Sequence, residues 1–124
     1  MLVTSGSAVG TAREVVDAKR EEGVKVGLVK ISLYRPFHKE RLAQALKGKK
    51  AFWVLYRSIC FGWDCGPLYM ETRAVTPEIG VVPMLSFIDG LDNMDITRDH
   101  IAGMIDGIQA ASEGRPYQEV TWLP

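Results

Sequence analysis

The chain has 124 residues and a formal net charge of zero, but residues 1–62 carry 12 basic against 5 acidic side chains (+7) and residues 63–124 carry 3 against 10 (−7). A hydrophobic content of 47% and a charged content of 24% are typical of one globular domain and argue against global disorder. Zero net charge removes the usual electrostatic reason for nucleic-acid binding, and no apolar run approaches the roughly 20 residues of a membrane helix.

Hydrophobic periodicity predicts strands and helices that alternate along the whole chain. Gly23 and Gly48 follow expected helices, and Pro67 suits the first position of another. Pro83 lies inside an expected strand, which predicts that this strand is bulged or at the sheet edge. In chain order we expect a strand at residues 2–4, a helix at 9–22, a strand at 24–31, a helix at 39–47, a strand at 51–56, a helix at 67–74, a strand at 80–88, a helix between Thr97 and Gly114, and a strand at 119–123.

This order of elements predicts an α/β sandwich with a mainly parallel sheet. Residues 51–56 are the most apolar short run and predict a central strand, whereas residues 24–31 predict a buried one. The loops that follow parallel strands meet at one edge of such a sheet, where we expect any site to lie. The shortness of the first strand predicts that the chain begins inside a strand of something longer. The clearest helical stripe consists of Ile101, Met104, Ile105 and Ile108.

Two cysteines, Cys60 and Cys65, are too few for a disulfide scaffold, an iron–sulfur cluster or a closed zinc site. A reducing, cytoplasmic location is therefore expected, and the first residues lack the features of a signal peptide. Cys65 directly precedes an expected helix, whose dipole would lower the pKa of its thiol. A buried or loop thiol is the favoured interpretation, while a regulatory disulfide with Cys60 stays open.

Other polar residues form no recognisable catalytic set. His38 and His100 have no carboxylate and nucleophile at a known spacing, which favours surface or capping roles. The basic stretch at residues 47–50 precedes Phe52 and Trp53 and could combine charge with base stacking, but a solvated turn is favoured and we expect no nucleic-acid partner. Four carboxylates before the last helix could hold Mg²⁺, although loop and capping roles explain most of them; these are Asp89, Asp92, Asp95 and Asp99.

A Ser-Gly-Ser turn at residues 5–7 joins the first strand to the first helix. Its backbone N–H groups could bind an anion at the start of that helix. The turn has neither the three-glycine spacing of a dinucleotide-binding loop nor the lysine of a P-loop. A tight turn with serine capping is the favoured interpretation, and an anion site stays open.

Several short strings occur in an ordered set that is specific although each string alone is weak. They are VTSGS at residues 3–7, VGLVKI at 26–31, YRPF at 34–37, RSICFG at 57–62, GPL at 66–68, GL at 90–91 and DIT at 95–97. In this order and spacing the chain resembles the C-terminal domain of the α subunit of pyruvate (2-oxoacid):ferredoxin oxidoreductase. The resemblance covers nearly the whole chain.

The resemblance implies a transketolase C-terminal-like fold, a three-layer α/β/α sandwich with a small, mainly parallel sheet. It also implies a whole enzyme that oxidatively decarboxylates a 2-oxoacid to an acyl-CoA and passes electrons to ferredoxin. Thiamine diphosphate, Mg²⁺, iron–sulfur clusters and CoA belong to other domains and subunits of that family. We therefore expect residues 1–124 to form one domain of a longer subunit that binds none of these groups alone and supplies no catalytic or metal-binding residue.

The leading hypothesis is a structural and docking domain that contacts the other domains and subunits of the oxidoreductase. The opposed charges of the two halves predict a dipolar domain whose association is favoured at low salt. An alternative hypothesis is a stand-alone domain that binds phosphate, CoA or a nucleotide at the 5–7 turn. A third is an enzyme that acts alone through Cys65. The residues expected at the docking or ligand-binding edge are Ser5, Gly6, Ser7, Arg35, Arg57, Ser58, Gly62 and Gly66.

Overall fold

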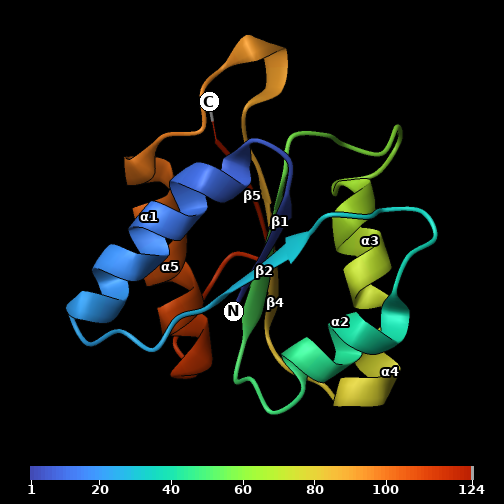
Figure 1. Cartoon of the computed structure of the whole chain (residues 1–124), viewed down its shortest axis with the longest axis horizontal. Coiled ribbons are helices and arrows are strands. Elements are labelled where there is room, and N and C mark those ends of the chain that lie inside the picture. Colours follow the sequence, from blue (N-terminus) through green and yellow to red (C-terminus); the bar gives the residue numbers. More distant parts are fainter. Residues whose placement is uncertain (124) are drawn as a thin grey trace.

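Strands and helices alternate along the chain in the computed structural model, which describes residues 1–123 (Figure 1). No helix within these residues is long and apolar enough to cross a membrane. The elements are β1 (Leu2–Ser5), α1 (Ala8–Glu21), β2 (Leu28–Ile31), α2 (Lys39–Leu46), β3 (Phe52–Tyr56), α3 (Pro67–Arg73), α4 (Thr76–Ile79), β4 (Met84–Ile88), the 3-10 turn η1 (Leu91–Asn93), α5 (Arg98–Ser112) and β5 (Val120–Trp122).

The five strands form one sheet in the order β2-β1-β3-β4-β5, and every neighbouring pair is parallel. Helices α1 and α5 cover one face of the sheet, and α2, α3 and α4 cover the other (Figure 1). The predicted three-layer α/β/α sandwich is thereby confirmed. The carboxyl ends of the parallel strands all point to one edge, so the loops that follow β1, β2, β3 and β4 lie along it.

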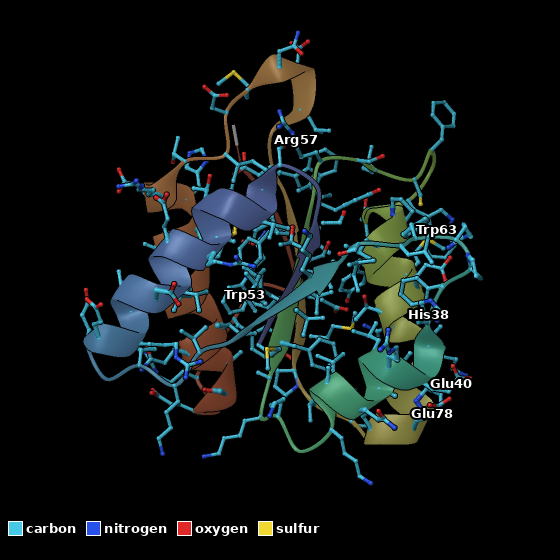
Figure 2. The ribbon with its side chains drawn as sticks, viewed as in Figure 1. His38, Glu40, Trp53, Arg57, Trp63 and Glu78 are labelled. Atoms are coloured by element: carbon cyan, nitrogen blue, oxygen red, sulfur yellow. The ribbon has the colours of Figure 1, made fainter. Side chains whose placement is uncertain are left out.

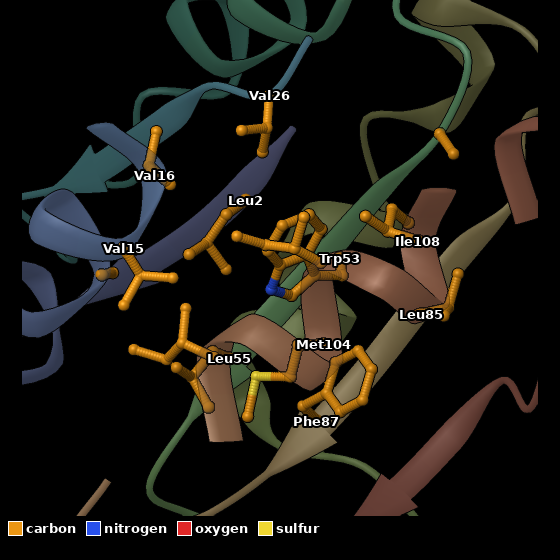
Figure 3. Close-up of a cluster of buried hydrophobic side chains, with 14 of the residues drawn as sticks. Leu2, Val15, Val16, Val26, Trp53, Leu55, Leu85, Phe87, Met104 and Ile108 are labelled. Carbon is orange, nitrogen blue, oxygen red and sulfur yellow. The ribbon is translucent and has the colours of Figure 1, made fainter. Parts of the chain in front are cut away.

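The core lies on both faces of the sheet because the central strands β1, β3 and β4 are mostly apolar and are buried along nearly their whole length. In β3, Trp53 and Leu55 pack under α1 and α5, whereas Phe52 and Val54 pack under α2 and α3. This alternation follows from the two-residue period of a strand. Trp53 is at the centre of the α1/α5 side, where it packs beside Leu2, Leu55 and Met104 (Figure 3). Phe52 and Trp53 are fully buried and therefore cannot stack on a nucleic-acid base.

Three expectations about the elements were wrong. The strand containing residues 84–88 is neither bulged nor at an edge: β4 pairs along its length with β3 and lies between β3 and β5. Pro83 precedes it and contributes only its carbonyl oxygen, which accepts a hydrogen bond from Phe52 N at 3.1 Å. The strand expected at residues 24–31 is shorter than predicted, and β2 is a half-exposed edge strand rather than a buried one. Helix α4 and the η1 turn were not predicted.

Candidate functional site at the carboxyl edge of the sheet

Arg57 ties together three loops at the carboxyl edge of the sheet. It directly follows β3, and each nitrogen of its guanidinium has one partner from another loop. Nε donates to Gly90 O at 3.2 Å, Nη1 donates to Ser7 Oγ at 3.2 Å, and Nη2 donates to Met94 O at 3.0 Å. Ser7 follows β1, and the two carbonyl groups follow β4 (Figure 2). Three of the five N–H donors that make arginine suited to anion binding are therefore engaged within the domain.

Gly90 is required where the Arg57 side chain crosses the loop after β4. Its φ of 73° is in the left-handed region, which glycine adopts without a Cβ penalty. A Cβ at this position would lie 2.7 Å from Arg57 Nε and 3.0 Å from Ile96 Cγ1. The guanidinium therefore packs against a backbone that only glycine allows to come so close.

Four of the predicted residues lie beside Arg57. Ser5, Gly6, Ser7 and Ser58 line, with Arg57, a small cavity of about 270 Å³ between the ends of β1 and β3. Gly6 has a φ of 69°, which the sharp turn from β1 into α1 requires. The expectation of serine capping was wrong, because Ser7 occupies the N-cap position of α1 without making a side-chain capping bond. Its hydroxyl accepts from Arg57 instead.

The loop between β3 and α3 carries two exposed aromatic side chains on a closed backbone. Cys60 N donates to Cys65 O, and Trp63 N donates to Cys60 O, both at 2.9 Å. Phe61 is fully exposed and the Trp63 side chain is 63% exposed (Figure 2). Gly62, one of the predicted residues, lies between them with a φ of 82° and does not reach the Arg57 cavity. The loop therefore presents its two largest apolar groups to solvent.

Gly66 has a packing role at the end of this loop. It is the N-cap of α3, and a Cβ there would collide with the carbonyl oxygen of Ser58. The close approach of the two backbones holds the 59–65 loop against the residues that follow Arg57. Gly66 thus contacts Ser58, another of the predicted residues. Its connection to Arg57 is only indirect, because Ser58 follows Arg57 in the chain.

Arg35 lies elsewhere on the same edge and does not join Arg57. Its guanidinium stacks over the Tyr34 ring at 4.2 Å and forms an ion pair with Glu71 on α3. Tyr34 in turn stacks on Tyr56 with ring centroids 6.5 Å apart. Burial raises the pKa of Tyr34 above its ordinary value, and the Glu71 carboxylate adds to the rise. Arg35 therefore fixes the loop after β2 to α3.

The cysteines do not form an activated site. Cys65 is buried, and burial raises the pKa of its thiol, with smaller contributions from Cys60 and Asp64. The expectation that the start of α3 lowers this pKa was wrong, because the loss of hydration outweighs the helix dipole. Both thiols are free in the structure. Within residues 1–123 no three His, Cys, Asp or Glu side chains converge as metal ligands, so Asp89, Asp92, Asp95 and Asp99 do not gather around one point.

One pair of functional interest was missed from the sequence. Asp89 directly follows β4 and is fully buried, and its Oδ2 lies 2.9 Å from His100 Nδ1. Its other oxygen accepts a hydrogen bond from Gly90 N at 2.6 Å. Thr97 caps α5, its side chain accepting from His100 N at 3.1 Å, and this places His100 in the first turn facing Asp89. The signal was a carboxylate at the end of a strand and a histidine at the start of the next helix, which the parallel topology brings to one edge.

Comparison with known proteins agrees with this architecture. Residues 1–101 match the family described as pyruvate:ferredoxin oxidoreductase core domain II. The chain belongs to this family. The resemblance inferred from the ordered strings is thereby confirmed, and core domain II is the unit to which the Arg57 cluster, the exposed aromatic loop and the Asp89–His100 pair belong.

Curated relatives of this core domain II are subunits of oxidoreductases. The chain is 43% identical over 124 residues to the NADH-dependent phenylglyoxylate dehydrogenase subunit alpha of Aromatoleum evansii, covering 98% of this chain and 30% of that protein. It is 43% identical over 102 residues to the pyruvate synthase subunit PorA of Thermotoga maritima, covering 82% of this chain and 26% of that protein. The chain thus spans less than a third of the length of these relatives.

A solved structure shows the same fold. It is described as "split gene transketolase, inactive beta4 tetramer", where beta4 refers to that protein's subunits. It superimposes on this chain with a TM-score of 0.68 at 15% sequence identity. The match covers 90% of this chain and 38% of that one. At this level of identity the likeness establishes the transketolase-like fold of core domain II.

Proposed function

We propose that this core domain II is a non-catalytic docking domain of a 2-oxoacid:ferredoxin oxidoreductase. The whole enzyme would oxidatively decarboxylate a 2-oxoacid to an acyl-CoA and transfer electrons to ferredoxin in the cytoplasm. Residues 1–124 would be one domain of its α subunit, holding that subunit against the thiamine-binding subunit. The proposal is supported by the family match and by relatives that include the ketoisovalerate oxidoreductase subunit VorA of Pyrococcus furiosus, 35% identical over 119 residues.

The donor groups of this chain do not fit the cofactors of such an enzyme. An iron–sulfur cluster takes four cysteine thiolates, whereas this chain has Cys60 and a buried Cys65 with a raised thiol pKa. Within the part of the chain that the structure describes, no group of three potential metal ligands converges. Thiamine diphosphate, Mg²⁺, the clusters and CoA are therefore assigned in this proposal to the other domains and subunits.

The observation that carries the docking role is the exposed aromatic pair on the loop after β3. Phe61 and Trp63 are exposed on a loop closed by backbone hydrogen bonds, and this loop follows β3 at the same edge of the sheet as Arg57. Tryptophan is enriched among residues that dominate binding energy, and a loop already held in place loses little entropy on association. Such a loop fits a partner protein that offers an apolar pocket.

The test uses the 124-residue chain with the remaining polypeptides of the oxidoreductase encoded beside it. Phe61→Ser and Trp63→Ser are introduced together, and association is measured by calorimetry while turnover of a 2-oxoacid with CoA and ferredoxin is followed. Val81→Ser is the matched control, because Val81 is 102% exposed but precedes β4 at the opposite edge of the sheet. We expect the double variant to weaken association at least tenfold and the control to leave it unchanged. Equal association of the two variants would refute the docking role of this loop.

The alternative, a stand-alone domain binding phosphate, CoA or a nucleotide at the 5–7 turn, has weaker support. Three of the five N–H donors of Arg57 are already bonded to protein oxygens, so fewer of them are left for an anion in the adjacent 270 Å³ cavity. Calorimetric titration of the chain with each of these ligands at millimolar concentration tests this alternative. Measurable heat with any of them would favour it over docking.

A further inference from the structure

A groove on the α5 side of the sheet is separate from the docking loop. Its volume is about 460 Å³, within the range of about 300–1,000 Å³ that is usual for small-molecule sites. Its walls come from α5, from β4 and from the segment that leads into β5. Its lining is mainly apolar, and the largest apolar side chains in it are Leu85, Phe87, Met104, Tyr117 and Leu123. Asp99, His100, Gln118 and Thr121 add polar groups.

His100 supplies a polar side chain of fixed orientation to this groove. Its Nδ1 faces the Asp89 carboxylate at 2.9 Å, and Asp89 is fully buried, so the carboxylate needs a hydrogen-bond donor there. In its neutral form the imidazole of His100 therefore carries its proton on Nδ1. Nε2 is then an acceptor, on the side of the ring turned away from Asp89. The pair presents one hydrogen-bond acceptor, fixed in orientation by a buried carboxylate, to an apolar groove.

Two glycines keep the α5 wall of the groove open. Gly103 and Gly107 both line it, although glycine inside a helix is less favourable than alanine. Packing does not require either glycine: a Cβ at Gly103 would meet nothing within 4 Å, and one at Gly107 would lie 3.9 Å from Phe87 Cζ, an ordinary contact. Glycine at these two positions therefore leaves space in the groove, and the packing of the core does not require it.

We propose that this groove binds small apolar molecules that carry one hydroxyl group, of the size and chemistry of phenol. The ring lies against Phe87 and Met104, and the hydroxyl donates a hydrogen bond to His100 Nε2. A carboxylate ligand is disfavoured, because Asp99 lines the groove and Asp89 contacts His100, so two carboxylates already lie beside the position of the ligand's polar group. This proposal does not depend on the docking function, since the groove and the 59–65 loop share no residue.

The chain is suited to a direct test by nuclear magnetic resonance because it contains two histidines, His38 and His100. His38 precedes α2 on the other face of the sheet and serves as an internal control. The probe is phenol, added to about 30 mM, several times the millimolar dissociation constant expected for a ligand of this size. Benzene and benzoate are titrated in parallel. Ring signals of both histidines are followed in proton–nitrogen spectra.

We expect phenol to move the His100 signals saturably and leave those of His38 in place, with benzene and benzoate each at least fivefold weaker. Gly103→Phe fills the groove and should weaken phenol binding at least tenfold, whereas Gly10→Phe, on an open site of α1, should not change it. If Gly103→Phe does not fold, Gly103→Leu replaces it. The proposal is overturned if His100 does not respond to phenol, if both histidines shift in parallel, if benzoate binds more tightly, or if the filled groove still binds.

Discussion

Replacing Arg57 with alanine tests whether this side chain holds the carboxyl-edge loops in place. The change removes three charge-assisted hydrogen bonds, to Ser7 Oγ, Gly90 O and Met94 O. Two of these bonds are at exposed groups and one is partly buried, so we expect a total loss of about 1–2 kcal/mol of unfolding free energy rather than the sum of three buried bonds. For a domain of this size that is a decrease of about 4–10 °C in the unfolding midpoint.

The assay is thermal unfolding by circular dichroism, combined with amide hydrogen exchange. Arg13→Ala is the matched control, because Arg13 is exposed on α1 and is separated from the site by more than one helical turn. Arg57→Lys should give an intermediate result, since one ammonium cannot reach three acceptors. Exchange should increase in residues 90–96 and remain unchanged in β3. If Arg57→Ala unfolds at the same temperature as the control, or if exchange in the 90–96 loop does not change, the assigned role of Arg57 is wrong.

Three further outcomes follow from the same geometry. Gly10→Ala should stabilise the chain by about 0.5–1 kcal/mol, because the added Cβ meets nothing within 4 Å. Gly66→Ala should destabilise it by about 2 kcal/mol, because the added Cβ collides with the carbonyl oxygen of Ser58. Chemical denaturation of the two variants measures both changes. Cys65 should react with iodoacetamide more slowly than Cys60 and only at higher pH, as mass spectrometry over time would show, because burial raises the pKa of its thiol. Burial and the Glu119 carboxylate raise the pKa of Tyr69 to about 12 from 10.0, so the folded state favours the neutral phenol. The contribution of the neutral Tyr69 side chain to the free energy of unfolding is complete below pH 10 and is lost as the pH rises from 10 to 12. Ultraviolet titration of the tyrosines should show one ionisation at the highest pH, and Tyr69→Phe should remove it.

The fold could be predicted from the sequence where the signal is local. The apolar run in β3 and the stripe on α5 both gave elements that the structure contains, because period and burial agree there. The prediction that β4 is bulged or at the sheet edge was wrong because Pro83 lies just before the strand and not inside it. The sequence does not distinguish a proline inside a strand from one just before it. The edge position of β2 depends on the order of strands across the sheet, which no local pattern in residues 24–31 contains.

The candidate site was predicted in part, for a similar reason. The topology rule placed Ser5, Ser7 and Arg57 at one edge, and the structure brings them together. It could not show that Arg57 bonds to carbonyl oxygens after β4, because backbone acceptors carry no sequence signal. Asp89 and His100 were interpreted separately as loop and surface residues. Only the packing of α5 on β4 makes them a pair.

Part of the opposed charge of the two halves is paired within the domain. Residues 1–62 supply β2, β1 and β3, and residues 63–124 supply β4 and β5. The two halves of the chain therefore lie next to each other in the sheet and meet between β3 and β4. Ion pairs join them across this boundary: Lys19–Asp106, Arg35–Glu71, Lys39–Glu78 and Glu14–Arg98. Each such exposed pair contributes only about 0–1 kcal/mol, but together they consume charges that would otherwise face a partner.

This pairing changes what salt should do to association. If the apolar side chains of Phe61 and Trp63 carry the docking, the dissociation constant should change less than threefold between low and physiological salt, because burying apolar surface does not depend on ionic screening. If unpaired charges carried it, association would weaken steeply over the same range. Calorimetry of the wild type and of the Phe61→Ser, Trp63→Ser variant at several salt concentrations separates the two cases. If association depends strongly on salt and the variant keeps this dependence, the charged faces and not the aromatic loop form the docking surface.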